Sequence, residues 1–152
     1  MPDEDIKTFD AMVAEAIPSI TEQTGIFYPA RIRTDEAWHG HFNSVGEKAY
    51  AVLEGITFDL YRLVFDELAS PEGTSLTVIG GGSHSAVWLQ LIADILNCPV
   101  SAGSGDGLLG AAAMAAGRDV VPVDSEIFYP DVSRRLLLEK RRLEYIEHIA
   151  CV

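Results

Sequence analysis

Three stretches of the chain carry apolar residues at helical spacing. Residues 45–68 place an apolar side chain at every third or fourth position, and shorter stripes of the same kind occupy residues 2–16 and 131–149. Such a stripe predicts an amphipathic helix that buries one face. The stripe of the last stretch consists of Val132, Leu136, Leu143, Ile146 and Ile149.

Short apolar runs alternate with these helices. Residues 25–29, 76–79 and 100–102 are predicted as strands, and residues 87–96 predict a helix between the last two. We interpret residues 30–43 as a loop, because their charged and aromatic side chains follow no clean period. This order of elements predicts an α/β domain with a small, mainly parallel sheet flanked by helices.

The second predicted strand runs directly into a turn that is suited to phosphate. Gly80, Gly81 and Gly82 follow the strand, and Ser83 and Ser85 precede the next helix. Glycines let a ligand approach the backbone closely, and the first N–H groups of a helix attract negative charge. We therefore predict phosphate binding at these five residues. The alternative is a tight turn that serves packing alone, since the spacing is neither G-x-G-x-x-G nor a Walker A loop.

Other glycines indicate close packing. Gly55 lies inside the predicted helix 45–68, where a glycine indicates that another backbone or a ligand passes nearby. Close packing of a second helix is the simpler of these explanations. A second glycine-rich turn is predicted at residues 103–107, followed by a helix of small residues over 108–116. Residues 119–130 are then predicted to be a connecting segment.

Composition and length restrict the class of protein. The 152 residues, 48% of them hydrophobic, are enough for a single domain with a real core. No apolar run reaches the length of a membrane span, and the acidic start MPDEDIKTFD does not resemble a secretory signal. Two cysteines, Cys98 and Cys151, are most simply reduced thiols, so we expect a cytoplasmic protein.

The net charge of -12 opposes binding to nucleic acid or an anionic membrane. Any phosphate site must then rely on local N–H groups. The basic residues near the C terminus alternate with acidic ones, so we interpret them as a solvated surface; they are Arg134, Arg135, Lys140, Arg141 and Arg142. His39 and His41 are expected to face solvent rather than bind a metal, because no third ligand accompanies them.

Three sequence motifs occur in a characteristic order. They read Tyr50-Ala-Val-Leu-Glu-Gly-Ile-Thr-Phe58, then Ile79-Gly-Gly-Gly-Ser-His-Ser-Ala-Val-Trp88, then Gly107-Leu-Leu-Gly-Ala-Ala-Ala113. Together they resemble the C-terminal domain of the FGGY carbohydrate kinases, the xylulose and related sugar kinases. The resemblance runs from about Gly25 to the C terminus.

The resemblance implies an incomplete actin-like ATPase (ribonuclease H-like) fold and transfer of the γ-phosphoryl group of ATP, with Mg²⁺, to a sugar hydroxyl. It places the turn Gly80-Gly81-Gly82 against the nucleotide, near its α-phosphate and ribose. Ser83 and Ser85 would border the adenosine. The small-residue helix that starts near Gly107 would pack behind this site.

Several family features are missing from these residues. The sequence contains no D-x-G-T phosphate loop and no aspartate in the motif of the family's catalytic base, and Ala30-Arg-Ile-Arg-Thr-Asp35 replaces a loop that usually reads G-E-R-T-P. We therefore expect residues 1–152 to be one domain, the nucleotide-side part of a sugar kinase that is inactive alone. A separate N-terminal half could complete it.

A second hypothesis is a non-catalytic, kinase-derived interaction or regulatory module. Only three short strands are predicted beside several helices, so exposed strand edges and apolar faces would seek a partner. We accordingly expect a homo-oligomer under either hypothesis.

Overall fold

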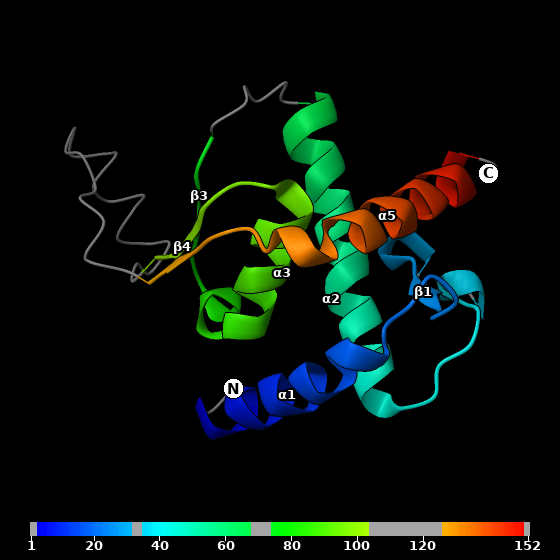
Figure 1. Cartoon of the computed structure of the whole chain (residues 1–152), viewed down its shortest axis with the longest axis horizontal. Helices are drawn as coiled ribbons and strands as arrows, with labels where there is room; N and C mark the ends of the chain where they lie inside the picture. The colour runs from blue at the N-terminus through cyan, green and yellow to red at the C-terminus, as the bar shows by residue number, and fades with distance from the viewer. Residues whose placement is uncertain (1–2, 32–34, 68–73, 104–125, 151–152) are drawn as a thin grey trace.

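The computed structural model describes residues 3–31, 35–67, 74–103 and 126–150 (Figure 1). Its helices are α1 (Asp3–Ala16), α2 (Val45–Tyr61), α3 (Ala86–Leu96) and α5 (Arg135–Ala150). Its strands are β1 (Ile26–Phe27), β2 (Trp38–His39), β3 (Leu76–Val78), β4 (Val100–Ala102) and β5 (Ile127–Phe128). A π-helical segment, η4 (Arg62–Glu67), continues α2. Single 3₁₀ turns are η1 (Ile17–Ser19), η2 (Pro29–Arg31), η3 (Asp35–Ala37), η5 (Gly81–His84) and η6 (Val132–Arg134).

These bounds confirm the four predicted helices that fall in the described residues. The small-residue helix predicted over 108–116 and most of the second glycine-rich turn lie outside them.

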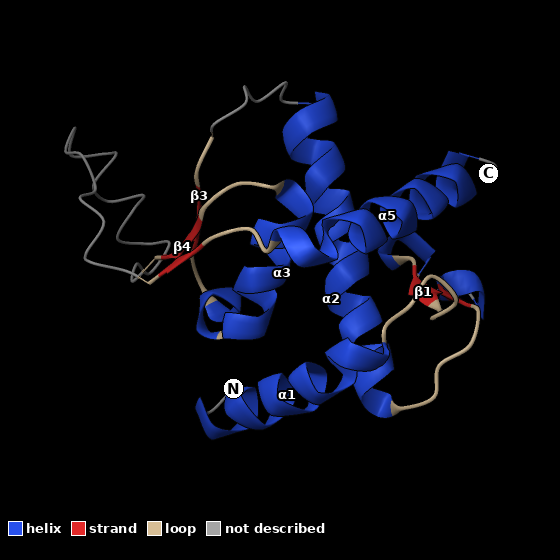
Figure 2. Cartoon of the chain, in the orientation of Figure 1, coloured by secondary structure: helices blue, strands red, loops and turns tan. Residues whose placement is uncertain are grey.

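The second helix stands at the centre of the molecule. Helices α1, α3 and α5 all pack against α2, and α5 crosses it near the middle (Figures 1 and 2). Ser44 begins α2 by accepting a hydrogen bond from the Glu47 N–H at 3.0 Å. A Cβ atom at Gly55 would collide with the carbonyl oxygen of Phe27, so β1 runs directly across α2. Another backbone thus passes close to Gly55, as predicted, but it is that of a strand and not of a second helix.

The strands form two small sheets. β3 and β4 pair in parallel, with Leu76 opposite Val100, and β5 adds to β4 in the antiparallel direction. β1 and β2 form a separate antiparallel pair. The β3–β4 pairing agrees with the predicted parallel sheet. Two predictions were wrong: residues 38–39 were assigned to a loop and 127–128 to a connecting segment, and both form two-residue strands, too short to show an alternating pattern.

The face that α5 buries was predicted correctly only in part. Leu138, Arg141 and Tyr145 are the buried residues of this helix. Three members of the predicted stripe are exposed, with 75%, 67% and 49% of the residue surface accessible at Val132, Leu136 and Leu143. The other two, Ile146 and Ile149, are partly buried against the core, as predicted. The true stripe includes an arginine, so an apolar pattern could not reveal it.

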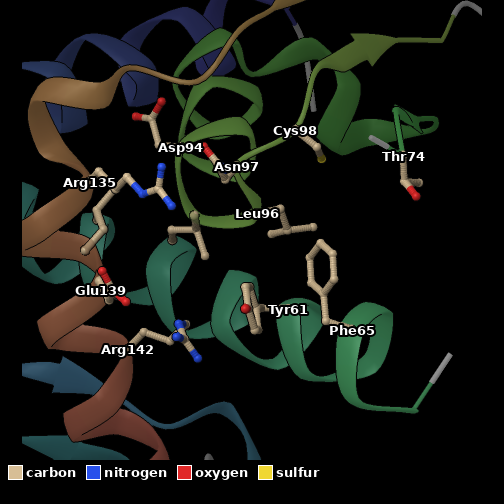
Figure 3. Close-up of a pocket in the computed structure, with 12 residues that line it drawn as sticks. Tyr61, Phe65, Thr74, Asp94, Leu96, Asn97, Cys98, Arg135, Glu139 and Arg142 are labelled. Carbon is tan, nitrogen blue, oxygen red and sulfur yellow. The ribbon is translucent and has the colours of Figure 1, made fainter. Parts of the chain in front are cut away.

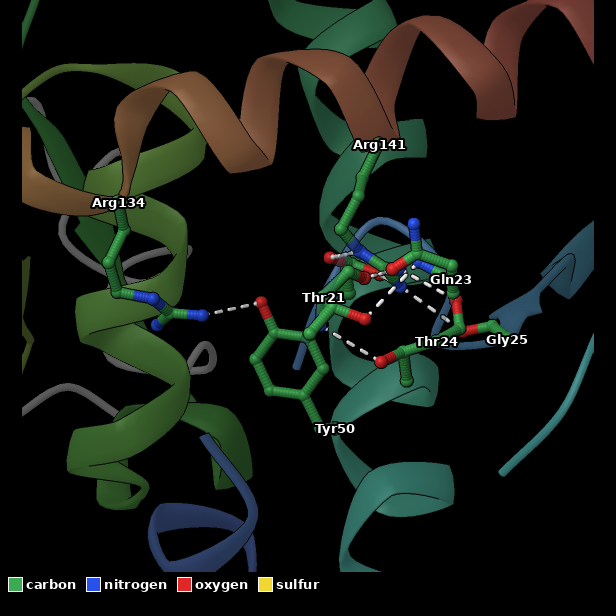
Figure 4. A network of polar contacts seen from close by, with 8 residues as sticks. Thr21, Gln23, Thr24, Gly25, Tyr50, Arg134 and Arg141 are labelled. Atoms are coloured by element: carbon green, nitrogen blue, oxygen red, sulfur yellow. Dashed lines mark hydrogen bonds and ion pairs between the residues drawn. The ribbon is translucent and has the colours of Figure 1, made fainter. Parts of the chain in front are cut away.

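Arg141 is the centre of a buried polar network, not part of a solvated surface as predicted (Figure 4). Its guanidinium donates to both carboxylate oxygens of Glu54, at 2.8 and 2.6 Å. It also donates to the backbone carbonyls of Thr21, Thr24 and Gly25, at 2.8, 2.7 and 3.1 Å. All five N–H donors of the side chain are therefore satisfied. The network ties α5 to α2 and to the segment that leads into β1.

In the described ranges no helix combines the length and apolarity needed to cross a lipid bilayer.

Candidate functional site

The glycine turn connects the C-terminal end of β3 to the N-terminal end of α3. Gly80 has φ 82 and ψ -160, a conformation open almost only to glycine. The chain then makes a single 3₁₀ turn, η5, which closes when the Ser83 N–H and hydroxyl both donate to the Gly80 carbonyl, at 3.0 and 2.8 Å. Side chains added at Gly80 or Gly81 would meet no atom within 4 Å. This part of the turn is therefore open surface.

The glycine turn packs on the ring of Trp88, which lies near the start of α3. A Cβ atom at Gly82 would lie 2.7 Å from the Trp88 ring, so only glycine allows this close approach. The indole N–H donates to the Thr57 hydroxyl of α2 at 3.1 Å, which fixes the ring in place. The position of the turn is thus set by the central helix.

The backbone amides of Gly81 and Gly82 are available to a ligand. Within the described residues, no hydrogen bond engages either N–H group, because both precede Ser83, whose N–H is the first donor of the 3₁₀ turn. Successive unpaired N–H groups in a turn form a concavity that binds anions. The turn can therefore receive a phosphate or carboxylate through its backbone.

The N terminus of α3 itself is already occupied. Ser85 caps this helix by accepting from the Trp88 N–H at 3.2 Å, and its hydroxyl donates to Asp10 of α1 at 2.6 Å. The other Asp10 oxygen accepts from the Val87 N–H at 3.4 Å. A carboxylate from the same chain thus takes the place an anion would favour at this helix. An incoming phosphate would use the glycine amides instead.

An apolar cavity of about 420 Å³ opens beside the turn. Its walls include Ile6 and Phe9 from α1, Leu53 from α2 and the Trp88 ring. Ligand pockets are typically concave and largely apolar with a few placed polar groups. Here the polar groups are the glycine amides together with His84 and Ser85, which also line the cavity, so the cavity suits a flat apolar body joined to an anion.

The structure brings the five predicted residues together but gives them different surroundings. Gly80 and Gly81 are exposed, and Gly82 and Ser83 are half-buried. Ser85 is buried, with its hydroxyl engaged as described. Nucleotide contact at each of the five stays a prediction. Sequence reasoning missed Ile6, Phe9 and Asp10, since nothing in α1 signals contact with a turn about 75 residues away.

His84 lines the cavity beside the turn, whereas His39, His41 and His148 do not. His39 and His41 are exposed, as expected, and the His39 ring lies 4.8 Å from that of His148 in α5. His148 also stacks on Tyr28 at 4.6 Å, so its ring takes part in packing. Across residues 3–31, 35–67, 74–103 and 126–150, no three carboxylate, histidine or cysteine side chains gather as a metal site.

The sequence matches known proteins over more than half of its length. Residues 20–117 match the model of the FGGY family of carbohydrate kinases, C-terminal domain. A xylulose kinase from Staphylococcus epidermidis is 49% identical over 53 residues, which cover 34% of this chain and 11% of that protein. A probable L-xylulose kinase from Haemophilus influenzae is 28% identical over 109 residues, covering 65% of this chain and 22% of that protein.

The fold agrees with the sequence match. A xyloylose kinase from Brucella ovis superposes with a TM-score of 0.73 at 24% identity, over 95% of this chain and 35% of the other. The chain thus spans about a third of the length of that solved kinase. Its fold is part of the actin-like ATPase fold of the sugar kinases, and the chain belongs to the FGGY family of carbohydrate kinases as a partial C-terminal domain.

Proposed function

We propose that this chain is the nucleotide-binding part of an ATP-dependent carbohydrate kinase. The observation that carries the proposal is the pair of unengaged amides, Gly81 and Gly82, at the mouth of an apolar cavity. In this arrangement the amides bind a phosphate group and the cavity between α1 and Trp88 takes the adenine ring. Ser83 holds the turn closed, and Ser85 fixes the start of α3 behind it.

We further propose that the isolated chain does not catalyse phosphoryl transfer. This reaction needs a positioned acceptor, a base and a metal ion in line with the γ-phosphate. The 152 residues contain no D-x-G-T phosphate loop and no aspartate in the motif of the family's base. The sugar site, the base and the Mg²⁺ ligands would come from an N-terminal kinase half, and the sugar is not identified by this chain.

A calorimetric titration with ATP in the presence of Mg²⁺ tests the nucleotide site. The decisive variant is Gly81→Pro, because proline removes the N–H at the first position of a 3₁₀ turn, where its ring is tolerated. Gly81→Ala is the matched control, since it keeps the N–H and its Cβ atom meets nothing within 4 Å. We expect saturable binding by the natural chain, little change in Gly81→Ala, and at least about tenfold weaker binding in Gly81→Pro, the size of one hydrogen bond to a charged group.

Equal affinities in the two variants would contradict a role for the Gly81 amide. No binding by the natural chain at millimolar ATP would contradict a nucleotide site in this chain and favour the second hypothesis. An assay for sugar-dependent ADP release should show no turnover with the chain alone, and turnover would contradict its inactivity.

The second candidate, a self-associating interaction module, is favoured by one observation. Val132, Leu136 and Leu143 expose apolar surface along the outer face of η6 and α5. A second copy of the chain could cover this face, which would also give the predicted homo-oligomer. Sedimentation of the natural chain and of Leu136→Glu tests it: a dimer lost in the variant supports self-association, and a monomeric natural chain contradicts it.

A further inference from the structure

A second cavity lies at the opposite end of α3 from the glycine turn. It has a volume of about 470 Å³ and lies between the C-terminal end of α2, the C-terminal end of α3 and the start of α5 (Figure 3). This volume is within the range of pockets that bind small molecules. The cavity shares no lining residue with the one beside the glycine turn.

One wall of this cavity carries two arginines whose N–H groups are not engaged. Arg135 and Arg142 extend from α5 toward the middle of the cavity (Figure 3). The Arg142 guanidinium lies over the Tyr61 ring, 4.3 Å from its centroid. Stacking uses the face of the guanidinium and leaves its N–H edge free. For the part of the chain that is described, no hydrogen bond or ion pair reaches either guanidinium.

The facing wall is aromatic and apolar. Tyr61 ends α2 and Phe65 belongs to the π-helical segment η4, and their ring centroids are 4.8 Å apart. Leu96 from α3 lies beside them. A π-helical turn is rare and occurs often at functional sites. The wider turn of η4 changes the direction in which the Phe65 side chain leaves the helix, compared with a regular α-helical turn.

The acidic groups at this cavity form no ion pair with Arg135 or Arg142 within the described residues. Asp94 is engaged elsewhere: it accepts from Gln90 and from the Asp131 N–H, each at 2.8 Å, and lies 4.0 Å from Arg134. Glu139 lies on α5 between the two arginines, but no ion pair joins it to either within the described residues. Among the described residues, both guanidiniums therefore keep N–H groups that can donate to an acidic group of a ligand.

We propose that this second cavity is a binding site for an aromatic anion. The acidic group of the ligand would accept from Arg135 and Arg142, and its flat ring would lie against Tyr61 and Phe65. The ligand class is an aryl carboxylate, sulfonate or phosphate. The site does not depend on the nucleotide site proposed above, because the two cavities lie at opposite ends of α3.

A fluorescence titration with 1-anilinonaphthalene-8-sulfonate tests the proposal, since this probe combines a sulfonate with aromatic rings. The matched neutral probe is N-phenyl-1-naphthylamine, which lacks the sulfonate. We expect the double variant Arg135→Gln/Arg142→Gln to bind the sulfonate at least about tenfold more weakly than the natural chain, the size of a hydrogen bond to a charged group. Its affinity for the neutral probe should change little.

Lys140→Gln is the control on the same helix. This lysine pairs with Glu22 at 2.7 Å on the surface and does not line the cavity, so its loss should leave sulfonate binding unchanged. Circular dichroism of each variant establishes that it is folded. Equal sulfonate affinity in the double variant and the natural chain would overturn the proposal. An equal loss of affinity for the two probes in the double variant would also overturn it.

The variant Gly81→Pro separates the two proposals. It should bind the sulfonate as the natural chain does, whereas the double arginine variant should keep its affinity for ATP. If one of the two sites does not bind its ligand, binding at the other can still be measured.

Discussion

Arg141 of α5 and Glu54 of α2 form an ion pair with both side chains completely buried, joined by hydrogen bonds of 2.8 and 2.6 Å. A buried charge is tolerated only when it is paired and fully hydrogen-bonded. Here the arginine also satisfies three backbone carbonyls of the segment before β1. The pair therefore fixes α5 and β1 on the central helix that also supports the glycine turn.

Arg141→Met should destabilise the fold strongly. Removing one member of a buried pair leaves the Glu54 carboxylate without its partner, which typically costs about 3–5 kcal/mol. Urea unfolding of the variant and the natural chain measures this difference. Lys140→Met is the control, because it removes only the exposed pair with Glu22 and should cost at most about 1 kcal/mol. Equal losses in the two variants would contradict a special role for the buried pair.

Sequence reasoning could identify most helices but not this pair. The apolar periodicity of residues 45–68 and 87–96 predicted the correct helices, although the buried face of α2 also includes Glu47, Glu54 and Thr57. In α5 the buried face contains Arg141 between Leu138 and Tyr145, and a charged residue in a stripe suggests solvent. Its burial depends on Glu54, 87 residues away. Only tertiary structure brings the two together.

The glycine turn could be identified from the sequence because its requirements are local. Its three consecutive glycines reflect local needs, a positive φ at Gly80 and contact with Trp88 at Gly82, and local needs are visible in a sequence. The contribution of α1 is not visible. Asp10 lies on an amphipathic helix where an acidic residue is ordinary, and its contact with Ser85 arises from helix packing. The two-residue strands β2 and β5 were missed because they are too short to alternate.

Ser85 and Asp10 should be energetically coupled. Ser85→Ala removes the cap of α3 and the donor to Asp10, and the loss of a cap costs about 0.5–2 kcal/mol. In Asp10→Ala the Ser85 side chain can still cap α3, but no carboxylate accepts from its hydroxyl and orients it. A double-mutant cycle by urea unfolding should give a coupling energy of about 0.5 kcal/mol or more. Additive effects would show that the contact between these side chains contributes nothing to stability.

Glu47 should make stability depend on acidic pH. A hydrogen bond from the Asn43 backbone N–H, at 2.6 Å, lowers the pKa of this buried carboxyl, the Ser19 hydroxyl adds to the effect, and burial opposes it. The unfolded state then binds more protons than the folded state, so this contribution is complete above the ordinary glutamate pKa of 4.5 and is lost as the pH falls below it.

Unfolding free energies measured between about pH 3 and pH 6 test this relation. The natural chain should lose stability more steeply with acid than Glu47→Gln, which cannot titrate at this position. Glu15→Gln, on the exposed face of α1, is the matched control and should follow the natural chain. Parallel curves for all three proteins would contradict the role assigned to Glu47.

The most direct test of the nucleotide site is an amide NMR titration of the ¹⁵N-labelled chain with ATP and Mg²⁺. If the glycine turn binds the nucleotide, the Gly81 and Gly82 amide resonances should shift in a saturable way, with Trp88 following as the cavity fills. The Arg135 and Cys98 amides, beside the second cavity, should stay in place. Shifts at Arg135 and Cys98 with none at Gly81 and Gly82, or no shifts at millimolar ATP, would contradict the assignment.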